Sequence, residues 1–395
     1  MSLDVDRSAW KRVSFGEVAD RVRSQIERGD VDRYVAGGHF DDGSLEVTRW
    51  GNPDDGGMGS TFTYGFLPGH TLFVSASWYL RKIAVATFEG VVADKTYVLA
   101  PRDPSILDPR FLPFILLTDR FHEYAAMQAT GSMNARLLWS ALAKYEFDLP
   151  PLDQQRRIAD LLWASEAVHR SRLELIRSLE RLRLAYAQRL FDSTTSRTSV
   201  ASLGVRSEQS VQVGPFGGSL ASRHFTESGV PVLKINNLTA GGLLDTRSLV
   251  YVSEDHAQDL ARYRVRAGDL LVAAQATVGR VAIVTEESAS SLISQHLIRV
   301  RVDPTLLEPS LLLLLFQCPG VQRQMEAVKT KTTRDGLNTS DVASFDLPQL
   351  SPEQRSAALF ELGKLESSRS ALKSADAADD ILKSAVLGIL EGSAR

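Results

Sequence analysis

A short motif occurs twice in this chain, and it constrains the fold more than any other feature of the sequence. Phe147-Asp148-Leu149-Pro150 returns as Phe345-Asp346-Leu347-Pro348. Each copy continues through a Gln-Arg pair, Gln155-Arg156 or Gln354-Arg355, into a long helical pattern. A four-residue match can arise by chance in a chain of 395 residues, but the shared continuation makes chance a poor explanation. The sequence therefore predicts one unit of about half the chain length, used twice.

Length and composition agree with two globular domains. A chain of 395 residues is longer than one core usually supports, and 44% hydrophobic and 24% charged residues are typical of a globular protein. No stretch approaches the roughly 20 apolar residues of a membrane span, and the N-terminus shows no signal-peptide pattern. The single cysteine, Cys318, excludes an internal disulfide and a cysteine-based metal site, so we expect a reducing, cytoplasmic location.

Both halves show the same order of expected elements. Short β-like runs come first and a helix-like segment comes last, which is typical of an α+β domain. In the first half the β-like runs are 71–75, 82–87 and 96–99, and the helix-like segment is 109–127. In the second half the runs are 230–235, 269–273, 280–285 and 297–302, and the helix-like segment is 309–328.

A long helix is expected after each domain. Residues 153–191 contain no Gly or Pro and place apolar residues on the a and d positions of one heptad register, interrupted by Ser165 and Arg172. The seam positions are Ile158, Leu161, Val168, Leu175, Leu179, Leu182 and Tyr186. Residues 352–390 repeat the spacing with smaller residues, at Leu365, Ser368, Leu372, Ala375, Leu382, Val386 and Ile389. Because each helix alone would expose an apolar stripe, we expect the two to pair antiparallel. The simpler alternative is a pair of ordinary bundle helices.

Several stretches resemble the specificity subunit of a type I restriction–modification system. The entry into the first long helix, 147–158, carries the resemblance, together with 213–220, 227–233, 266–271 and 279–282. In the first half, 67–73 and 79–84 occupy the corresponding places. The halves have diverged, since His70 stands where the second half has Asp269, and the second long helix opens one residue later than the first.

The resemblance implies an α+β fold with two target-recognition domains, separated by two long antiparallel coiled-coil spacer helices, in a pseudo-twofold internal repeat. The implied boundaries are 1–150 for the first recognition domain, 151–192 for the central spacer, 193–350 for the second recognition domain and 351–395 for the C-terminal spacer. It also implies sequence-specific binding of double-stranded DNA at a bipartite, asymmetric target. The implied partners are two methyltransferase subunits and a restriction and translocase subunit, which would use S-adenosylmethionine, ATP and Mg, while this chain would bind no cofactor.

Candidate DNA contacts are polar side chains near strand ends and in loops, because base edges are recognised by Arg, Lys, Asn and Gln and phosphates also by Ser and Thr. In the first domain they are Ser77, Tyr79, Arg81, Lys82, Lys95, Ser132, Asn134 and Arg136, with Asp94 beside Lys95. In the second domain they are Ser219, Arg223, Lys234, Asn236, Asn237, Gln275, Thr277, Arg280, Gln295 and His296, with Ser294 beside them. A loop adds Lys329, Lys331, Thr332, Thr333, Arg334 and Asn338. The simpler interpretation is that these residues belong to ordinary solvated loops and to turns formed by asparagine, without contact to DNA.

The sequence contains no motif for catalysis. Asn52-Pro53-Asp54-Asp55 lacks the second proline and the aromatic residue of an adenine-methyltransferase motif, and no Gly-x-x-x-x-Gly-Lys-Ser/Thr is present. The seven histidines show no metal-ligand spacing. We therefore expect a chain without catalytic activity. The alternatives are a coiled-coil scaffold whose domains bind protein, the recognition subunit of another phage-defence or modification system, and an independent enzyme. A net charge of −3 is unusual for a DNA-binding protein, so positive surfaces must be local.

Overall fold

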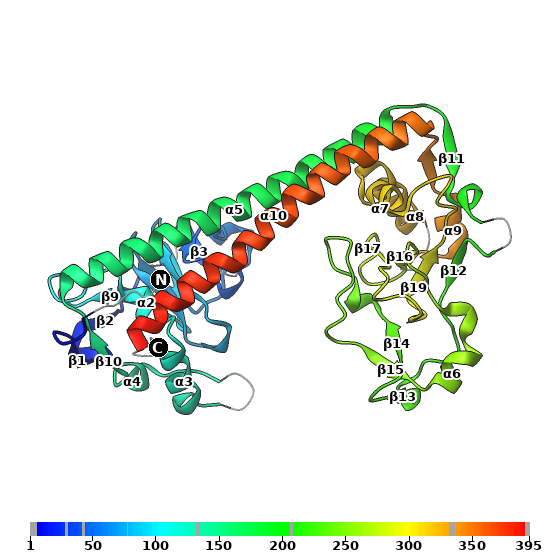
Figure 1. Ribbon diagram of the computed structural model, residues 1–395. Helices are drawn as coiled ribbons and strands as arrows, with labels where there is room; N and C mark the ends of the chain where they lie inside the picture. The colour runs from blue at the N-terminus through cyan, green and yellow to red at the C-terminus, as the bar shows by residue number, and fades with distance from the viewer. Residues whose placement is uncertain are drawn as a thin grey trace. The chain divides into compact units, whose positions relative to one another are not determined.

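The computed structural model describes residues 6–27, 31–41, 44–76, 78–131, 135–205, 208–331 and 336–391 (Figure 1). Side chains are not described at 329–331 in helix α8 or at 376–380 and 382 in helix α10. The chain forms two compact units. Unit 1 comprises residues 1–174 and 372–395, and unit 2 comprises residues 175–371.

Unit 1 is an α+β unit built around a five-stranded sheet. The sheet order is β2 (Ala19–Val22), β9 (Thr96–Pro101), β6 (Thr71–Val74), β7 (Ile83–Ala86) and β4 (Glu46–Val47). A second sheet has the order β3 (Tyr34–Val35), β8 (Gly90–Ala93) and β5 (Phe62–Phe66). The short helices are α1 (Phe15–Val18), α2 (Leu112–Ile115), α3 (Asp119–Gln128) and α4 (Trp139–Leu142), with single 3₁₀ turns at Gly37–His39, Pro53–Asp55 and Trp78–Leu80.

Alternation along β6 explains why its sheet is covered on both faces. Phe73 packs with Phe114 and Phe121 in the core beneath the helices. Leu72 and Val74 face the opposite way and join the core that contains residues of the smaller sheet. All four residues of the strand are buried, as expected for a strand between two layers.

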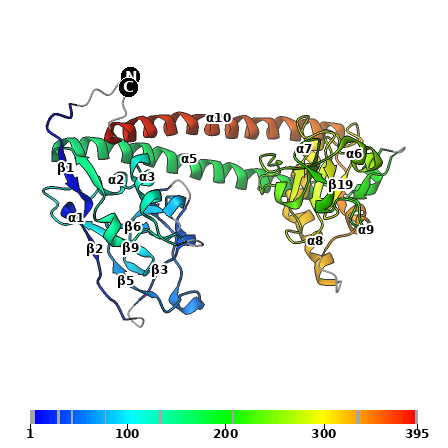
Figure 2. The same ribbon diagram turned by 90° about the horizontal axis from the view of Figure 1, so that it is seen from below.

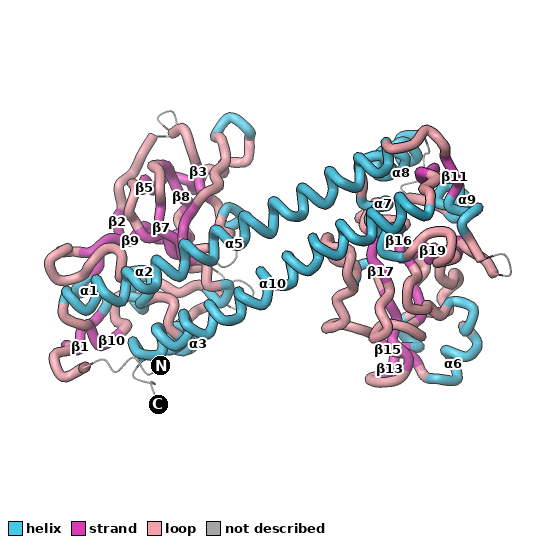
Figure 3. Tube along the Cα trace, turned by 45° about the horizontal axis from the view of Figure 1, so that its top comes forward, coloured by secondary structure: helices cyan, strands magenta, loops and turns pink. Residues whose placement is uncertain are grey.

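Unit 2 repeats this plan with two four-stranded sheets. The first has the order β12 (Val211–Val213), β19 (Leu297–Val300), β16 (Leu270–Ala273) and β17 (Val281–Ile283). The second has the order β13 (Phe225–Thr226), β15 (Val250–Val252), β14 (Val230–Leu233) and β18 (Leu292–Ile293). The helices are α6 (Glu254–Asp259), α7 (Pro309–Gln317), α8 (Pro319–Lys331) and α9 (Thr339–Ser344), with 3₁₀ turns at Val200–Leu203, Ser222–His224, Ile235–Asn237 and Ala261–Tyr263. Figure 3 shows α7 beside β16 and β17, with which it makes direct contacts.

The repeated tetrapeptide has the same structural role in both units. It forms the strand that precedes a long helix, and it pairs antiparallel with the first strand of the unit. In unit 1, β10 (Glu146–Leu149) pairs with β1 (Lys11–Ser14), and Phe147 lies opposite Val13. In unit 2, β20 (Asp346–Pro348) pairs with β11 (Arg197–Ser199), and Leu347 lies opposite Thr198. The repeat in the sequence is thus a repeat in the fold.

The two long helices are α5 (Leu152–Asp192) and α10 (Pro352–Glu391). In unit 1, Ile158 and Leu162 of α5 share a core with Val386 and Leu390 of α10. In unit 2, Ala187 and Leu190 of α5 share a core with Ala358 and Leu362 of α10. Within each unit the helices therefore run antiparallel, as Figure 2 also shows. No helix within the described ranges is both long and apolar enough to cross a membrane.

The heptad register predicted for α5 is wrong at four of its seven apolar positions. Ile158 is buried, but Leu161, Val168, Leu175 and Leu182 are exposed. The buried face instead carries Leu162 together with the polar residues Glu166, Arg172 and Arg183. Glu166 accepts a hydrogen bond from the Leu45 backbone at 2.7 Å, and its other carboxylate oxygen lies 3.5 Å from the Lys383 ammonium. The apolar pattern predicts the wrong buried face for α5, because these polar side chains are buried together with their partners. In α10, Val386 and Ile389 are buried as predicted, while Ser368 and Ala375 are exposed.

Each expected helix that precedes the repeated motif is two helices. The segment 109–127 is divided between α2 and α3, where Thr118 caps α3 by accepting the Phe121 N–H at 3.2 Å. The segment 309–328 is divided between α7 and α8 at Cys318. Proline 319 explains this break, because the residue before a proline avoids the helical conformation.

Candidate nucleic-acid interface

Four predicted contact residues of unit 2 line one groove, which we call the Lys234 groove. They are Lys234, Asn236, Gln295 and His296, and the groove has a volume of about 580 Å³. Strands β14 and β18 bring them together because these strands run parallel, with Leu233 paired to Ile293. The residues that follow the two strands must then emerge at the same edge of the sheet.

A glycine-rich loop, residues 214–218, forms one wall of the Lys234 groove. A Cβ added to Gly214 would lie 2.2 Å from the Ser294 carbonyl oxygen, so only glycine permits this close approach. The loop presents Phe216, which is 66% exposed. Ser219 donates to the Phe216 carbonyl at 3.0 Å, and the exposed Arg223 donates to the Gly218 carbonyl at 3.4 Å. Phe216 is therefore an exposed aromatic beside the groove that our contact prediction omitted, and its only sequence signal was its place in a glycine-rich turn.

Asn236 and Gln295 are exposed in the Lys234 groove, whereas Lys234 and His296 are half-buried. The Lys234 ammonium lies 4.3 Å from the centre of the Phe225 ring, and the Gln295 amide lies 3.1 Å from the His296 ring nitrogen. Asn236 is exposed. Asn237 differs, since it is 4% exposed and its amide donates to the carbonyls of Asp245 and Ser248 at 2.9 and 3.3 Å. In this structure Asn237 holds the loop that carries Lys234 and Asn236.

A second hollow of unit 2, of about 450 Å³, contains Thr277 and Arg280 together with Arg183 and Gln317. The Arg280 guanidinium donates to the Leu238 carbonyl at 3.2 Å. Arg183 forms an ion pair with Glu180 at 2.7 Å and donates to Gln317 at 2.5 Å. Arg183 was not among the predicted contacts, because an arginine in a heptad pattern usually faces solvent. Gln275, just before this hollow, is exposed and does not line it.

The loop predicted after the helix-like segment of unit 2 is only partly described. Thr332, Thr333 and Arg334 lie outside the described residues, and Lys329 and Lys331 belong to α8 at positions whose side chains are not described. Asn338 is exposed and caps α9, because its side chain accepts the Asp341 N–H at 2.9 Å.

Predicted residues of unit 1 fall into two places. Arg81 and Lys82 line a hollow of about 540 Å³, where Arg81 pairs with Asp119 at 2.6 Å and Lys82 donates to the Gly37 carbonyl at 2.6 Å. The neighbouring Tyr79 is exposed.

The second place in unit 1 is an ion pair. Arg136 pairs with the Asp94 carboxylate at 3.3 Å and donates to the Asp94 carbonyl at 2.7 Å. Lys95 is exposed beside them. Ser77, Ser132 and Asn134 lie outside the described residues.

Groups suited to metal binding are not gathered in the part of the chain that the structure describes. No three His, Cys, Asp or Glu side chains there lie close enough to hold a metal ion. Cys318 is fully buried, and this burial raises the pKa of its thiol, which favours the unreactive protonated form.

No family model matches the sequence, and no curated protein matches it. Solved structures do match. A structure described as the basis of complex assembly and conformational transition of the type I R-M system matches at a TM-score of 0.56 and 17% identity, over 98% of both chains. The type I restriction-modification S subunit from M. genitalium matches at a TM-score of 0.54 and 12% identity, also over 98% of both chains. The chain has the fold of a type I S subunit. This S-subunit fold extends over both units and includes α5 and α10.

Proposed function

We propose that this chain is the DNA-recognition subunit of a type I restriction–modification complex. Each unit would read one half of a bipartite, asymmetric target in double-stranded DNA. The observation that carries the proposal is the likeness to S-subunit structures over 98% of both chains. The repeated plan of units 1 and 2 supports two DNA-reading units. The different side chains of the two units support two different half-site sequences.

The Lys234 groove has the chemistry that base reading requires. Asn and Gln amides can contact adenine in two places at once, and Lys can donate to guanine acceptors in the major groove. Asn236 and Gln295 are exposed in this groove, on two adjacent strand ends of a rigid sheet. A rigid frame with free polar tips favours direct readout over a purely electrostatic contact. Because the net charge of the chain is −3, attraction to the DNA phosphates would have to come from local positive surfaces.

The remaining activities of such a complex would belong to other chains. We propose that two methyltransferase subunits supply methyl transfer with S-adenosylmethionine, and that a restriction and translocase subunit uses ATP and Mg. This chain would bind no cofactor and have no catalytic activity of its own. One of the similar solved structures is described in terms of the assembly of the type I R-M complex, and this similarity supports partners of this kind.

The proposal is tested with the chain and its co-encoded methyltransferase subunits in a methylation-free host. Sequencing of methylated bases should reveal a bipartite motif that depends on this chain. Replacing Asn236 and Gln295 by alanine should relax or abolish one half of the motif, with about 1–3 kcal/mol lost per base contact. Arg247→Ala is the matched control, because Arg247 is an exposed residue of unit 2 outside the groove.

Two results would contradict this function. The first is a complex that does not retain duplex DNA, which would favour the alternative of a protein-binding scaffold. The second is methyl transfer, nuclease or ATPase activity in the purified chain that is lost on mutation of this chain.

A further inference from the structure

The Lys234 groove of unit 2 has a counterpart in unit 1. A pair of parallel strands forms the same frame in each unit, with Val35 of β3 opposite Val92 of β8, and Leu233 of β14 opposite Ile293 of β18. The residues that follow two parallel strands emerge at one edge of the sheet. In unit 1 we call this place the Asp94 edge. It comprises Asp94 and Lys95, which follow β8, and Arg136, which contacts Asp94.

Equivalent hydrogen bonds show which residues correspond after the second strand of each pair. The Ser75 N–H donates to the Lys95 carbonyl at 2.8 Å in unit 1, and the Ala274 N–H donates to the His296 carbonyl at 2.9 Å in unit 2. Lys95 therefore stands where unit 2 has His296. The residues just before them, Asp94 and Gln295, correspond as well.

The turn after the first strand of each pair is also closed in the same way. His39 Nδ1 accepts the Ala36 N–H at 3.0 Å, and the side-chain oxygen of Asn237 accepts the Lys234 N–H at 2.8 Å. Ala36 and Gly38 therefore occupy the positions of Lys234 and Asn236. The turn of unit 1 has no polar side chain at either position, so the polar groups of the Asp94 edge come from the other strand and from Arg136.

Arg136 adds a cation where unit 2 has no side chain. The Leu137 N–H donates to the Ser75 carbonyl at 3.0 Å, and the Leu337 N–H donates to the Ala274 carbonyl at 2.8 Å. Arg136 thus corresponds to Gly336. A Cβ added to Gly336 would lie 2.7 Å from the Ala274 carbonyl oxygen, so a side chain there would displace the backbone of unit 2.

Arg136 is held in one orientation by its neighbours. It donates to the Ser75 hydroxyl at 3.3 Å, to the Asp94 carboxylate at 3.3 Å and to the Asp94 carbonyl at 2.7 Å, and its guanidinium lies 5.8 Å from the centre of the Tyr97 ring. Each terminal nitrogen of a guanidinium carries a second N–H. Neither of these two N–H groups has an acceptor among the described residues. Because the Arg136 side chain is 27% exposed, a ligand at this edge can reach them.

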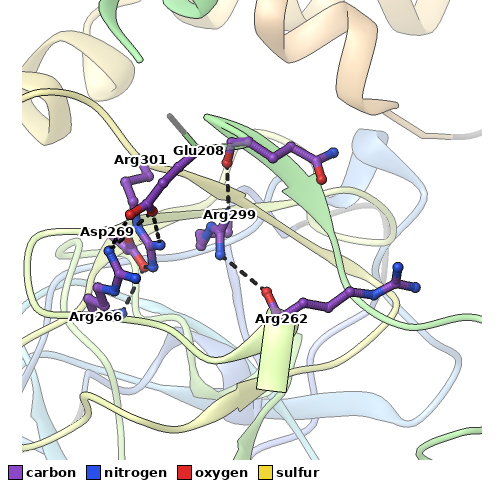
Figure 4. Close-up of polar contacts among 7 residues, drawn as sticks. Glu208, Arg262, Arg266, Asp269, Arg299 and Arg301 are labelled. Atoms are coloured by element: carbon purple, nitrogen blue, oxygen red, sulfur yellow. Dashed lines mark hydrogen bonds and ion pairs between the residues drawn. The ribbon is translucent and has the colours of Figure 1, made fainter. Parts of the chain in front are cut away.

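The arginines of unit 2 that follow or belong to β19 do not offer the same chemistry. Arg301 pairs with Asp269 at 2.6 Å and with Glu208 at 2.8 Å, and the buried Arg299 donates to the Gln209 carbonyl at 2.8 Å (Figure 4). These guanidinium groups join segments of unit 2 to one another, and neither arginine lines the Lys234 groove. Arg136 differs, because it lies at the edge that corresponds to this groove.

We infer that Arg136 reads a guanine in the half-site of unit 1, and that Asp94 is its positioning residue. This inference rests on the proposed function. In the major groove guanine presents two acceptors, O6 and N7, to which one arginine can donate in parallel. Adenine presents one acceptor and one donor there, and arginine has no acceptor for that donor. The amides of Asn236 and Gln295 in unit 2 carry both kinds of group, so the corresponding edges of the two units suit different bases.

The test is methylome sequencing of a methylation-free host that carries this chain with its co-encoded methyltransferase subunits. Arg136→Ala should make one guanine position degenerate in the unit 1 half of the motif, with discrimination against the other bases reduced about five-fold or more. The unit 2 half should stay the same. Arg102→Ala is the matched control and should change neither half, because Arg102 is an exposed arginine paired with Asp20 at 2.7 Å, at the opposite end of β9 from Lys95.

Two further variants separate base reading from a structural role. Arg136→Gln should shift the preference at this position from guanine towards adenine, because an amide can both donate to N7 and accept from N6. Asp94→Asn keeps the backbone carbonyl that holds Arg136, so it should weaken the guanine preference less than Arg136→Ala does. A loss of stability alone would lower methylation at all sites and leave the base preference as it was.

The half read by unit 1 is the one that survives exchange of residues 200–345. The inference is overturned if this half contains no G·C pair, or if Arg136→Ala and Arg136→Gln keep the full guanine preference. It is also overturned if both variants abolish methylation and lower the thermal midpoint of the purified chain, because Arg136 would then be structural. In each of these cases a wild-type bipartite motif that depends on this chain still upholds the proposed function. The proposed function itself fails if no motif depends on the chain.

Discussion

His70 and Asp269 close the same turn in units 1 and 2. The His70 Nδ1 accepts the N–H of Leu67 at 3.1 Å, and an Asp269 carboxylate oxygen accepts the N–H of Arg266 at 2.8 Å. Each follows a glycine with positive φ, 88° at Gly69 and 87° at Gly268. The two residue types differ, but both supply a side-chain acceptor three residues after the same backbone donor. The turn has therefore been kept in both units while its chemistry changed.

Because only the turn of unit 1 contains a histidine, we expect the stability that this turn contributes to depend on pH in unit 1. His70 accepts a hydrogen bond only when its Nδ1 is unprotonated, and burial lowers its pKa. A lowered pKa means that the stabilisation is present above the unfolded value of about 6.5 and is lost as the pH falls below it. His70→Asp should keep the turn and reduce this dependence between pH 7.5 and 5, as measured by urea unfolding. A dependence unchanged in His70→Asp would show that His70 does not contribute to it.

His122 should cause a larger loss of stability than His70 as the pH falls. It is buried against Trp78, and burial, followed by the charge of Arg81, lowers its pKa to about 4. The unfolded chain takes up the proton at a higher pH than the folded chain, so stability falls as the pH drops from about 6.5 to 4. The loss is up to about 3 kcal/mol. His122→Phe keeps a ring in this place and should flatten the profile, with little change at pH 7.5. Equal slopes for wild type and variant would contradict the prediction.

Leu161 and Leu162 test which face of α5 is buried. Leu162 is 1% exposed and Leu161 is 51% exposed, although the two are adjacent. Leu162→Ala should destabilise unit 1 by about 2–5 kcal/mol, because it leaves a cavity in the core. Leu161→Ala should change stability by less than about 0.5 kcal/mol. Chemical denaturation of both variants measures the loss in unfolding free energy. A larger loss for Leu161→Ala than for Leu162→Ala would contradict the buried face described here and support the heptad register predicted from the sequence.

The sequence predicted elements that depend on the local pattern. The strands around Leu72, Leu271 and Leu297 and both long helices lie where the apolar runs indicated, because strand and helix periods are properties of neighbouring residues. The repeated Phe-Asp-Leu-Pro motif also predicted the duplicated plan, since each copy must form the same strand before the same kind of helix.

Features that depend on tertiary partners could not be read from the pattern. The buried face of α5 holds Glu166 and Arg183, whose partners Leu45 and Gln317 are distant in sequence. Asn237 looked like a free amide after a strand, but it holds its own loop. The Lys234 groove was predictable only as separate polar clusters, because the parallel pairing of β14 with β18 joins residues about 60 positions apart. All of the predicted DNA contacts stay predictions.

The central claim is that this chain reads DNA through two separate units. The most direct measurement is the methylome of cells that carry the chain with its methyltransferase subunits, compared with cells in which residues 200–345 are exchanged for the equivalent unit of a relative. The account predicts a bipartite motif in which the exchange alters one half and leaves the other unchanged. A motif that does not depend on this chain, or two halves that change together, would contradict it.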